Sequence, residues 1–142
     1  MEREIERVYA TLVTRVVRKP TAPPSAGRLP VWLCCRDMPV FKHQKQCLSD
    51  VLVNDGLHQH AAAFQPPVSR LGVDLVTHFE ECRDLYVRRG LPLIRIDVQP
   101  ITHDIGAVMD YVRKQIGRGM TGEDAMLILP RGRSEMKDIL TG

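Results

Sequence analysis

The chain has 142 residues, of which 44% are hydrophobic and 26% are charged, which suits one domain, over 1–142, with a single hydrophobic core. No apolar run approaches the length of a membrane span, so we expect no membrane partner; aromatic residues make up only 5% of the chain, which excludes a platform of several stacked rings. The net charge of +3 is weakly basic and does not prove a polyanionic partner. Four cysteines without a CxxC pair or a secretory signal predict reduced thiols in a cytoplasmic protein.

The N-terminal part predicts two strands separated by a loop. Residues 5–17 are dense in valine, threonine and tyrosine, which favours a strand, with a helical first turn as the alternative for its start. Residues 18–30 hold four prolines and predict an extended surface loop. The apolar run over 31–35 predicts a short buried strand.

A pair of histidines, His58 and His60, lies on a strand predicted to end at Pro66-Pro67. Side chains alternate along a strand, so both imidazoles point to the same face. Two imidazoles on a rigid strand are the beginning of a divalent-metal site, which needs at least one further ligand.

The third ligand depends on the preceding turn. Residues 47–53 read as a strand, with a helix over 42–53 as the alternative. If they are a strand, residues 54–56 form a three-residue hairpin loop, and the pairing brings Asp50 to the face of the histidines. A two-residue turn would break this parity.

The second half of the chain predicts two helices and two strands. Its predicted elements are a helix over 72–88 capped by Ser69 or Asp74, a strand over 92–98, a helix over 105–116 capped by Asp104, and a short strand over 125–129, for which the last turn of a helix from Thr121 is the alternative. Tyr86 is predicted to be a packing residue, His78 a surface or packing residue rather than a ligand, and residues 131–142 a frayed tail.

A second group of reactive side chains lies on the predicted helix 105–116. Tyr111 and Lys114 are three residues apart and so share a helix face. A phenolate is a competent nucleophile towards phosphorus, and a nearby ammonium stabilises negative charge. A metal held by the histidines could polarise a scissile phosphate.

The order of these motifs resembles that of the HUH endonucleases, and most of all their single-tyrosine branch, the rolling-circle replication initiators of plasmids, phages and small DNA viruses. The segment His58-Gln59-His60-Ala-Ala-Ala-Phe-Gln-Pro-Pro is similar to the family's metal motif, and Tyr111-Val-Arg-Lys114 to its nucleophile motif. The resemblance covers roughly residues 5–130, with a weakly defined first motif on the predicted strand around 11–14. Gln59 departs from the family pattern, which normally has a hydrophobic residue there.

The resemblance implies a fold, a chemistry and a cofactor. The fold is α+β, a central antiparallel sheet with helices packed on it in a ferredoxin-like or RRM-like arrangement. The tyrosine attacks a phosphodiester of single-stranded or hairpin DNA and forms a 5′-phosphotyrosine link, which initiates rolling-circle replication. The metal is Mg²⁺ or Mn²⁺, with His58 and His60 as ligands and Asp50 in the place of the family's acidic third ligand.

Three alternatives remain beside this prediction. The chain could be a non-catalytic nucleic-acid-binding or regulatory module on the same scaffold, or a single-tyrosine transposase, in which Gln115 would suit the metal site. A small metal hydrolase is a less favoured third reading. The residues predicted to contact the DNA backbone, which supply affinity rather than specificity, are Arg18, Lys42, Lys45, Arg113 and Arg118.

Overall fold

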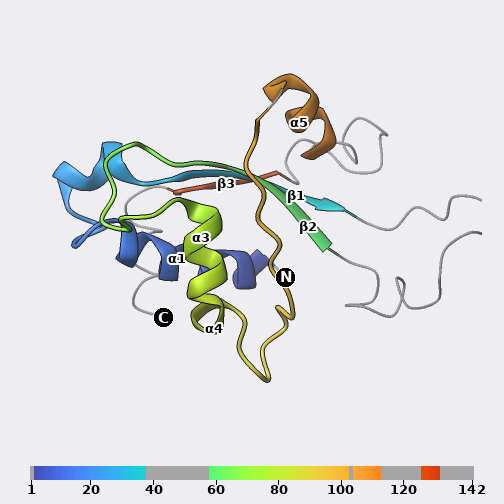
Figure 1. Ribbon diagram of the computed structural model, residues 1–142, viewed down its shortest axis with the longest axis horizontal. Coiled ribbons are helices and arrows are strands. Elements are labelled where there is room, and N and C mark those ends of the chain that lie inside the picture. Colours follow the sequence, from blue (N-terminus) through green and yellow to red (C-terminus); the bar gives the residue numbers. More distant parts are fainter. Residues whose placement is uncertain (1, 38–57, 103, 113–125, 132–142) are drawn as a thin grey trace, which may run out of the picture. The chain divides into compact units, whose positions relative to one another are not determined.

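The computed structural model describes residues 2–37, 58–102, 104–112 and 126–131 (Figure 1); for Arg36, Asp37, His58, Tyr111 and Val112 it describes the backbone only. The described residues form an α+β structure, which confirms the predicted class at this level. Their strands make a three-stranded antiparallel sheet in the order β2-β1-β3, with β1 at Val31–Asp37, β2 at His58–Phe64 and β3 at Leu127–Leu129. Within the described ranges, no helix has both the length and the apolar content needed to cross a membrane.

The chain divides into two compact units. Unit 1 comprises Met1–Trp32, Ala63–Pro100 and Ile128–Gly142, and unit 2 comprises Leu33–Ala62 and Ile101–Leu127. His58, His60 and Tyr111 therefore belong to unit 2. The single domain predicted over 1–142 stays a prediction.

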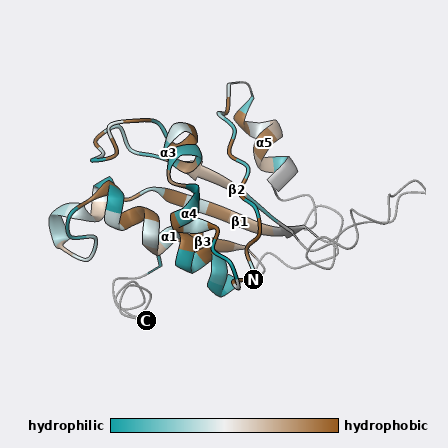
Figure 2. Cartoon of the chain, turned by 60° about the horizontal axis from the view of Figure 1, so that its bottom comes forward, coloured by the Kyte–Doolittle hydropathy of each residue, from teal (hydrophilic) through white to brown (hydrophobic). Residues whose placement is uncertain are grey.

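Helix α1 (Glu2–Val16) occupies most of the segment predicted as a strand over 5–17, so that prediction was wrong. Its buried residues include Val8, Leu12 and Val16, which recur every four positions as one face of a helix requires. Figure 2 accordingly shows both hydrophobic and hydrophilic residues on α1. The strand prediction relied on β-branched composition, which favours a strand only where neighbouring strands offer a surface to pack on.

Helices α3 (Leu75–Glu81) and α4 (Arg83–Tyr86) take the place of the single helix predicted over 72–88. Asp74 caps α3 as predicted, because its Oδ1 accepts a hydrogen bond from the backbone N–H of Thr77 at 2.8 Å. This bond lowers the pKa of Asp74. The break between the two helices falls at Cys82, and α4 packs against α1 (Figure 1).

Aromatic side chains form the centre of the unit 1 core. The ring centroids of Tyr9 and Trp32 are 5.4 Å apart, those of Trp32 and Phe79 are 6.4 Å apart, and those of Phe79 and Tyr86 are 4.5 Å apart. These spacings are typical of edge-to-face and tilted aromatic pairs, which stabilise a core beyond the area they bury. The core thus joins α1, β1, α3 and α4.

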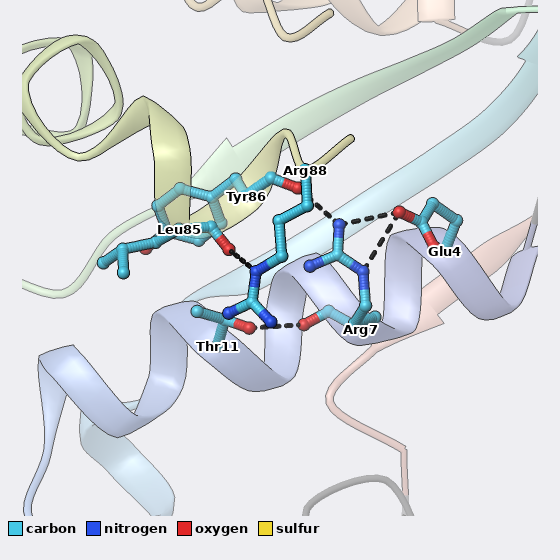
Figure 3. A network of polar contacts seen from close by, with 6 residues as sticks. All are labelled: Glu4, Arg7, Thr11, Leu85, Tyr86 and Arg88. Carbon is cyan, nitrogen blue, oxygen red and sulfur yellow. Dashed lines mark hydrogen bonds and ion pairs between the residues drawn. The ribbon is translucent and has the colours of Figure 1, made fainter. Parts of the chain in front are cut away.

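A network around Arg7 fastens α1 to the end of α4 (Figure 3). The Arg7 guanidinium donates from Nε and Nη2 to Glu4 Oε1 at 3.0 and 2.6 Å, and Nη2 also donates to the backbone carbonyl of Tyr86. Thr11 Oγ1 donates to the Arg7 carbonyl at 2.9 Å. Arg7 thereby donates to both a carboxylate and a carbonyl oxygen. Leaving such groups buried without a hydrogen-bond partner would cost free energy.

Three further predictions are corrected. The segment 92–98 forms neither a strand nor a helix and is not part of the sheet of the described residues. The loop 18–30 is not extended throughout, because it contains a short 3-10 helix, η1 (Pro23–Arg28). Arg131, predicted to begin a frayed tail, makes ion pairs with Glu2 at 2.6 Å and Glu6 at 2.8 Å, while 132–142 lie outside the described residues.

Candidate metal and nucleophile site

Strand β2 contains both histidines, and the alternation of a strand assigns backbone positions 58 and 60 to one face. His58, His60 and Ala62 alternate with Gln59 and Ala61 along this strand. Ala61 is exposed, whereas Ala62 is only 1% exposed. The histidines therefore share the face of β2 that is covered at Ala62, and Gln59 belongs to the opposite face.

A small hydrophobic cluster joins this face of β2 to the helix that carries the tyrosine. Its buried members are Cys35 of β1 and Ala62 of β2, and Met109 and Met126 pack against them. Met109 lies in α5 (Ile105–Val112). Ala62 is two positions from His60 and Met109 is two positions from Tyr111, so the cluster holds together the segments of unit 2 that bear both motifs.

Helix α5 begins at the predicted cap. Asp104 Oδ1 accepts a hydrogen bond from the Gly106 N–H at 2.8 Å, and the Val108 N–H donates to the Asp104 carbonyl at 3.3 Å. The first bond satisfies a first-turn N–H group that has no partner inside the helix, and the second is the first regular backbone hydrogen bond of the helix. As far as it is described, α5 confirms the predicted helix 105–116, and Tyr111 lies in its last described turn.

The register of α5 sets where Tyr111 lies around the helix. Val108 and Met109 are half-buried, and successive residues turn by about 100°. Position 111 is therefore about 60° from Val108 and about 160° from Met109. Backbone position 111 is thus closer in angle to Val108 than to Met109, the residue that packs against the cluster of Cys35 and Ala62.

Several predicted site residues lie outside the described residues. They are the candidate ligands Asp50 and Gln115, the cation Lys114, and the basic residues Lys42, Lys45, Arg113 and Arg118. Among the residues that are described, no three histidine, cysteine or acidic side chains gather as a metal-binding group. His58 and His60 supply two nitrogen donors, so they fit part of a metal site.

The Cys34 thiol of β1 does not resemble a catalytic group. Burial raises the pKa of the Cys34 thiol to about 12, and the neighbouring Cys35 adds to this shift. A thiol that stays protonated at neutral pH is a poor nucleophile and a poor metal ligand. Cys34 and Cys82 form no disulfide within the described part of the chain, and the predicted reduced state of the thiols stays a prediction.

His78 and Tyr86 are packing residues, as predicted, and form a buried pair in unit 1. His78 Nε2 and Tyr86 Oη are 2.6 Å apart. Burial lowers the pKa of His78, and the positive charge of Arg15 lowers it further. Burial also raises the pKa of Tyr86 to about 12, so the pair is a neutral hydrogen bond in the core.

A surface pocket in unit 1 was not predicted. It has a volume of about 350 Å³ and lies where the end of α1, the loop with η1 and residues 68–70 meet. Arg18, the one predicted DNA contact within the described residues, lines it together with Lys19, Arg28 and Arg70. The only sequence signal was the basic character of the proline-rich loop, because Arg70 is distant in sequence.

Comparisons with known protein families, with characterised proteins and with solved structures found no match. A function for this chain therefore rests on the chemistry and placement of its own residues. The strongest such placement is the joining of the histidine strand and the tyrosine helix by one hydrophobic cluster.

Proposed function

We propose that this protein is a metal-dependent endonuclease of the HUH type that nicks and rejoins single-stranded DNA, with Tyr111 as its nucleophile. The observation that carries the proposal is the packing of Ala62 and Met109 in one cluster. It links the strand of His58 and His60 to the helix of Tyr111 within one compact unit. A histidine pair that holds a metal and a tyrosine nucleophile are the parts that phosphodiester transfer needs.

In the proposed reaction, the oxygen of Tyr111 forms a bond to the scissile phosphorus and the bond from phosphorus to the 3′ oxygen breaks. The products are a 5′-phosphotyrosine and a 3′-hydroxyl, which takes up the proton that the tyrosine loses. Attack by the released 3′-hydroxyl reverses the step and rejoins the strand. Lys114 is proposed to stabilise the charge that develops on the phosphate.

A divalent metal bound by His58 and His60 would polarise the phosphate and make the phosphorus more electrophilic. Asp50 is the proposed third ligand, with Gln115 as the alternative. Imidazole nitrogen is a softer donor than oxygen, so a site with two histidines favours Mn²⁺ over Mg²⁺. Both histidines come from one strand, whose backbone would hold their Cα positions in place when the metal binds.

The α+β class and the antiparallel sheet are consistent with this proposal, and the ferredoxin-like arrangement is part of it. Two features depart from the resemblance: residues 11–14 are helical, and residues 92–98 form no strand. If the first motif of the family has a counterpart here, we place it on β1, the first strand of the described sheet. The proposed setting is replication initiation in the cytoplasm.

A second candidate function is non-catalytic binding of nucleic acid on the same scaffold. The register of α5 favours it, because position 111 lies about 160° around the helix from Met109, which packs against the cluster of Cys35 and Ala62. A tyrosine turned away from the histidines could not attack a phosphate bound near them. This candidate predicts DNA binding that does not depend on metal and no cleavage.

The test is cleavage of labelled single-stranded and hairpin oligonucleotides by the full chain with Mn²⁺ and with EDTA. His58→Gln and His60→Gln should each abolish the metal-stimulated cleavage. Gln59→Ala is the matched control, since it changes the opposite face of the same strand and should leave cleavage intact. Cleavage that survives both histidine substitutions would contradict the proposed metal site. Metal-independent DNA binding without cleavage would establish the second candidate.

A further inference from the structure

The pocket of unit 1 concentrates positive charge on a small area. Arg18, Lys19, Arg28 and Arg70 all line it, and all four side chains are exposed. Its lining contains no acidic residue. The whole chain carries a net charge of only +3. Because four positive charges line this one pocket, the rest of the chain has no net positive charge.

The four cations come from three separate segments. Arg18 and Lys19 follow the end of α1, Arg28 ends η1, and Arg70 lies beyond β2. Cations after a helix end stabilise its dipole, but that accounts for the first two only. Within the described part of the chain, none of the four side chains has an ion pair or a hydrogen bond.

Backbone hydrogen bonds fix the walls of the pocket. The Arg70 N–H donates to the Val16 carbonyl at 3.0 Å, which fastens residues 68–70 to the end of α1. The Ala22 N–H donates to the Lys19 carbonyl at 3.1 Å, and the Ser25 N–H donates to the Ala22 carbonyl at 3.0 Å. The pocket is therefore formed before a ligand arrives, which lowers the entropy cost of binding.

The remaining lining is mostly nonpolar and aliphatic, and is supplied by Val16, Val17, Ala22, Pro24 and Val68. Ser69 adds a polar group whose Oγ accepts from the Leu71 N–H at 3.1 Å, which leaves its hydroxyl hydrogen for a ligand. Ligand pockets commonly combine a nonpolar wall with a few convergent polar groups, at volumes of roughly 300–1,000 Å³. The 350 Å³ of this pocket falls in that range.

We propose that this pocket binds a phosphate ester, with the phosphate on the four cations and a nonpolar organic group on the aliphatic wall. Arginine matches the oxygens of a phosphate with paired hydrogen bonds. A phosphate offers more charge and more acceptor oxygens than a carboxylate, so it suits four cations better. The same chemistry is present in a free nucleotide and in a nucleic-acid strand, and the inference holds whether or not the proposed nuclease is active.

The test is isothermal titration calorimetry of the full chain with inorganic phosphate, phenyl phosphate, thymidine 5′-monophosphate and decathymidylate. Arg28→Gln/Arg70→Gln should raise the Kd of the organic phosphates by about tenfold, because two charge-assisted hydrogen bonds are lost. The matched control is Arg83→Gln/Arg89→Gln, which removes the same charge from two exposed arginines outside the pocket and should change the Kd by less than about twofold.

Val68→Asp is a second probe, since Val68 is 61% exposed and the variant buries no charge. It should abolish binding while leaving the thermal unfolding temperature nearly unchanged. Tight binding of the two monoesters identifies a free organic phosphate as the ligand, and binding of decathymidylate alone identifies a strand. The proposal would be overturned by equal weakening in both double variants or by binding that survives Val68→Asp. It would also be overturned if inorganic phosphate bound as tightly as the esters, or if no probe bound.

Discussion

The hydrogen bond between His78 and Tyr86 makes a strong prediction about stability. Tyr86→Phe keeps the ring that packs on Phe79 at a centroid distance of 4.5 Å, but removes the hydroxyl 2.6 Å from His78 Nε2. The imidazole is buried and then lacks a partner at Nε2, which costs about 1–3 kcal/mol. With a urea m-value of about 2 kcal/mol/M, the unfolding midpoint should fall by roughly 0.5–1.5 M.

A double-mutant cycle separates this bond from general disruption of the core. His78→Leu alone leaves the Tyr86 hydroxyl without its partner, whereas His78→Leu/Tyr86→Phe removes both polar groups. The double variant should therefore be more stable than the sum of the two single losses implies, by about 0.5 kcal/mol or more. Additive losses, or a Tyr86→Phe loss below about 0.5 kcal/mol, would refute the reasoning.

The remaining predictions concern pH, the network at α1 and the thiols. The pKa of His78 is lowered from 6.5 in the folded state, so the unfolded chain binds more protons below that pH. The free energy of unfolding should therefore fall as the pH drops from 7 to 5. His78→Gln should make the thermal unfolding temperature less dependent on pH over this range. Arg7→Met removes hydrogen bonds to a carboxylate and a carbonyl and should lower the free energy of unfolding in urea by about 2 kcal/mol. The control Arg3→Met changes an exposed residue on the same helix and should lower it by less than about 0.5 kcal/mol. Equal losses of unfolding free energy in the two variants would contradict the network. Iodoacetamide at pH 8 should alkylate the half-buried Cys82 before the buried Cys34, as peptide mass spectrometry would record, and the reverse order would contradict the assigned burial.

Local periodicity predicted the features that depend on neighbours in sequence. The shared face of His58 and His60 follows from the two-residue repeat of a strand, and the caps at Asp74 and Asp104 follow from residue type at a helix start. The segment 5–17 shows the limit of composition, because its valines favour a strand while their spacing fits the helix that forms.

Features that depend on distant residues were less accessible from the sequence. A strand at 92–98 needs a partner to pair with, and the sequence does not say which strands meet. The basic pocket joins Arg18 to Arg70, which only the folded chain brings together. The third metal ligand depends on the length of one turn before His58, and Asp50 lies outside the described residues.

The measurement closest to the central claim is the identification of the residue that becomes linked to DNA. The full chain would be incubated with a cleavable single-stranded oligonucleotide and Mn²⁺, digested, and sequenced by mass spectrometry. The proposed function predicts a nucleotide adduct on Tyr111 that Tyr111→Phe abolishes, with Tyr9 and Tyr86 unmodified because both are fully buried. An adduct on another residue, or strand cleavage that persists in Tyr111→Phe, would contradict it.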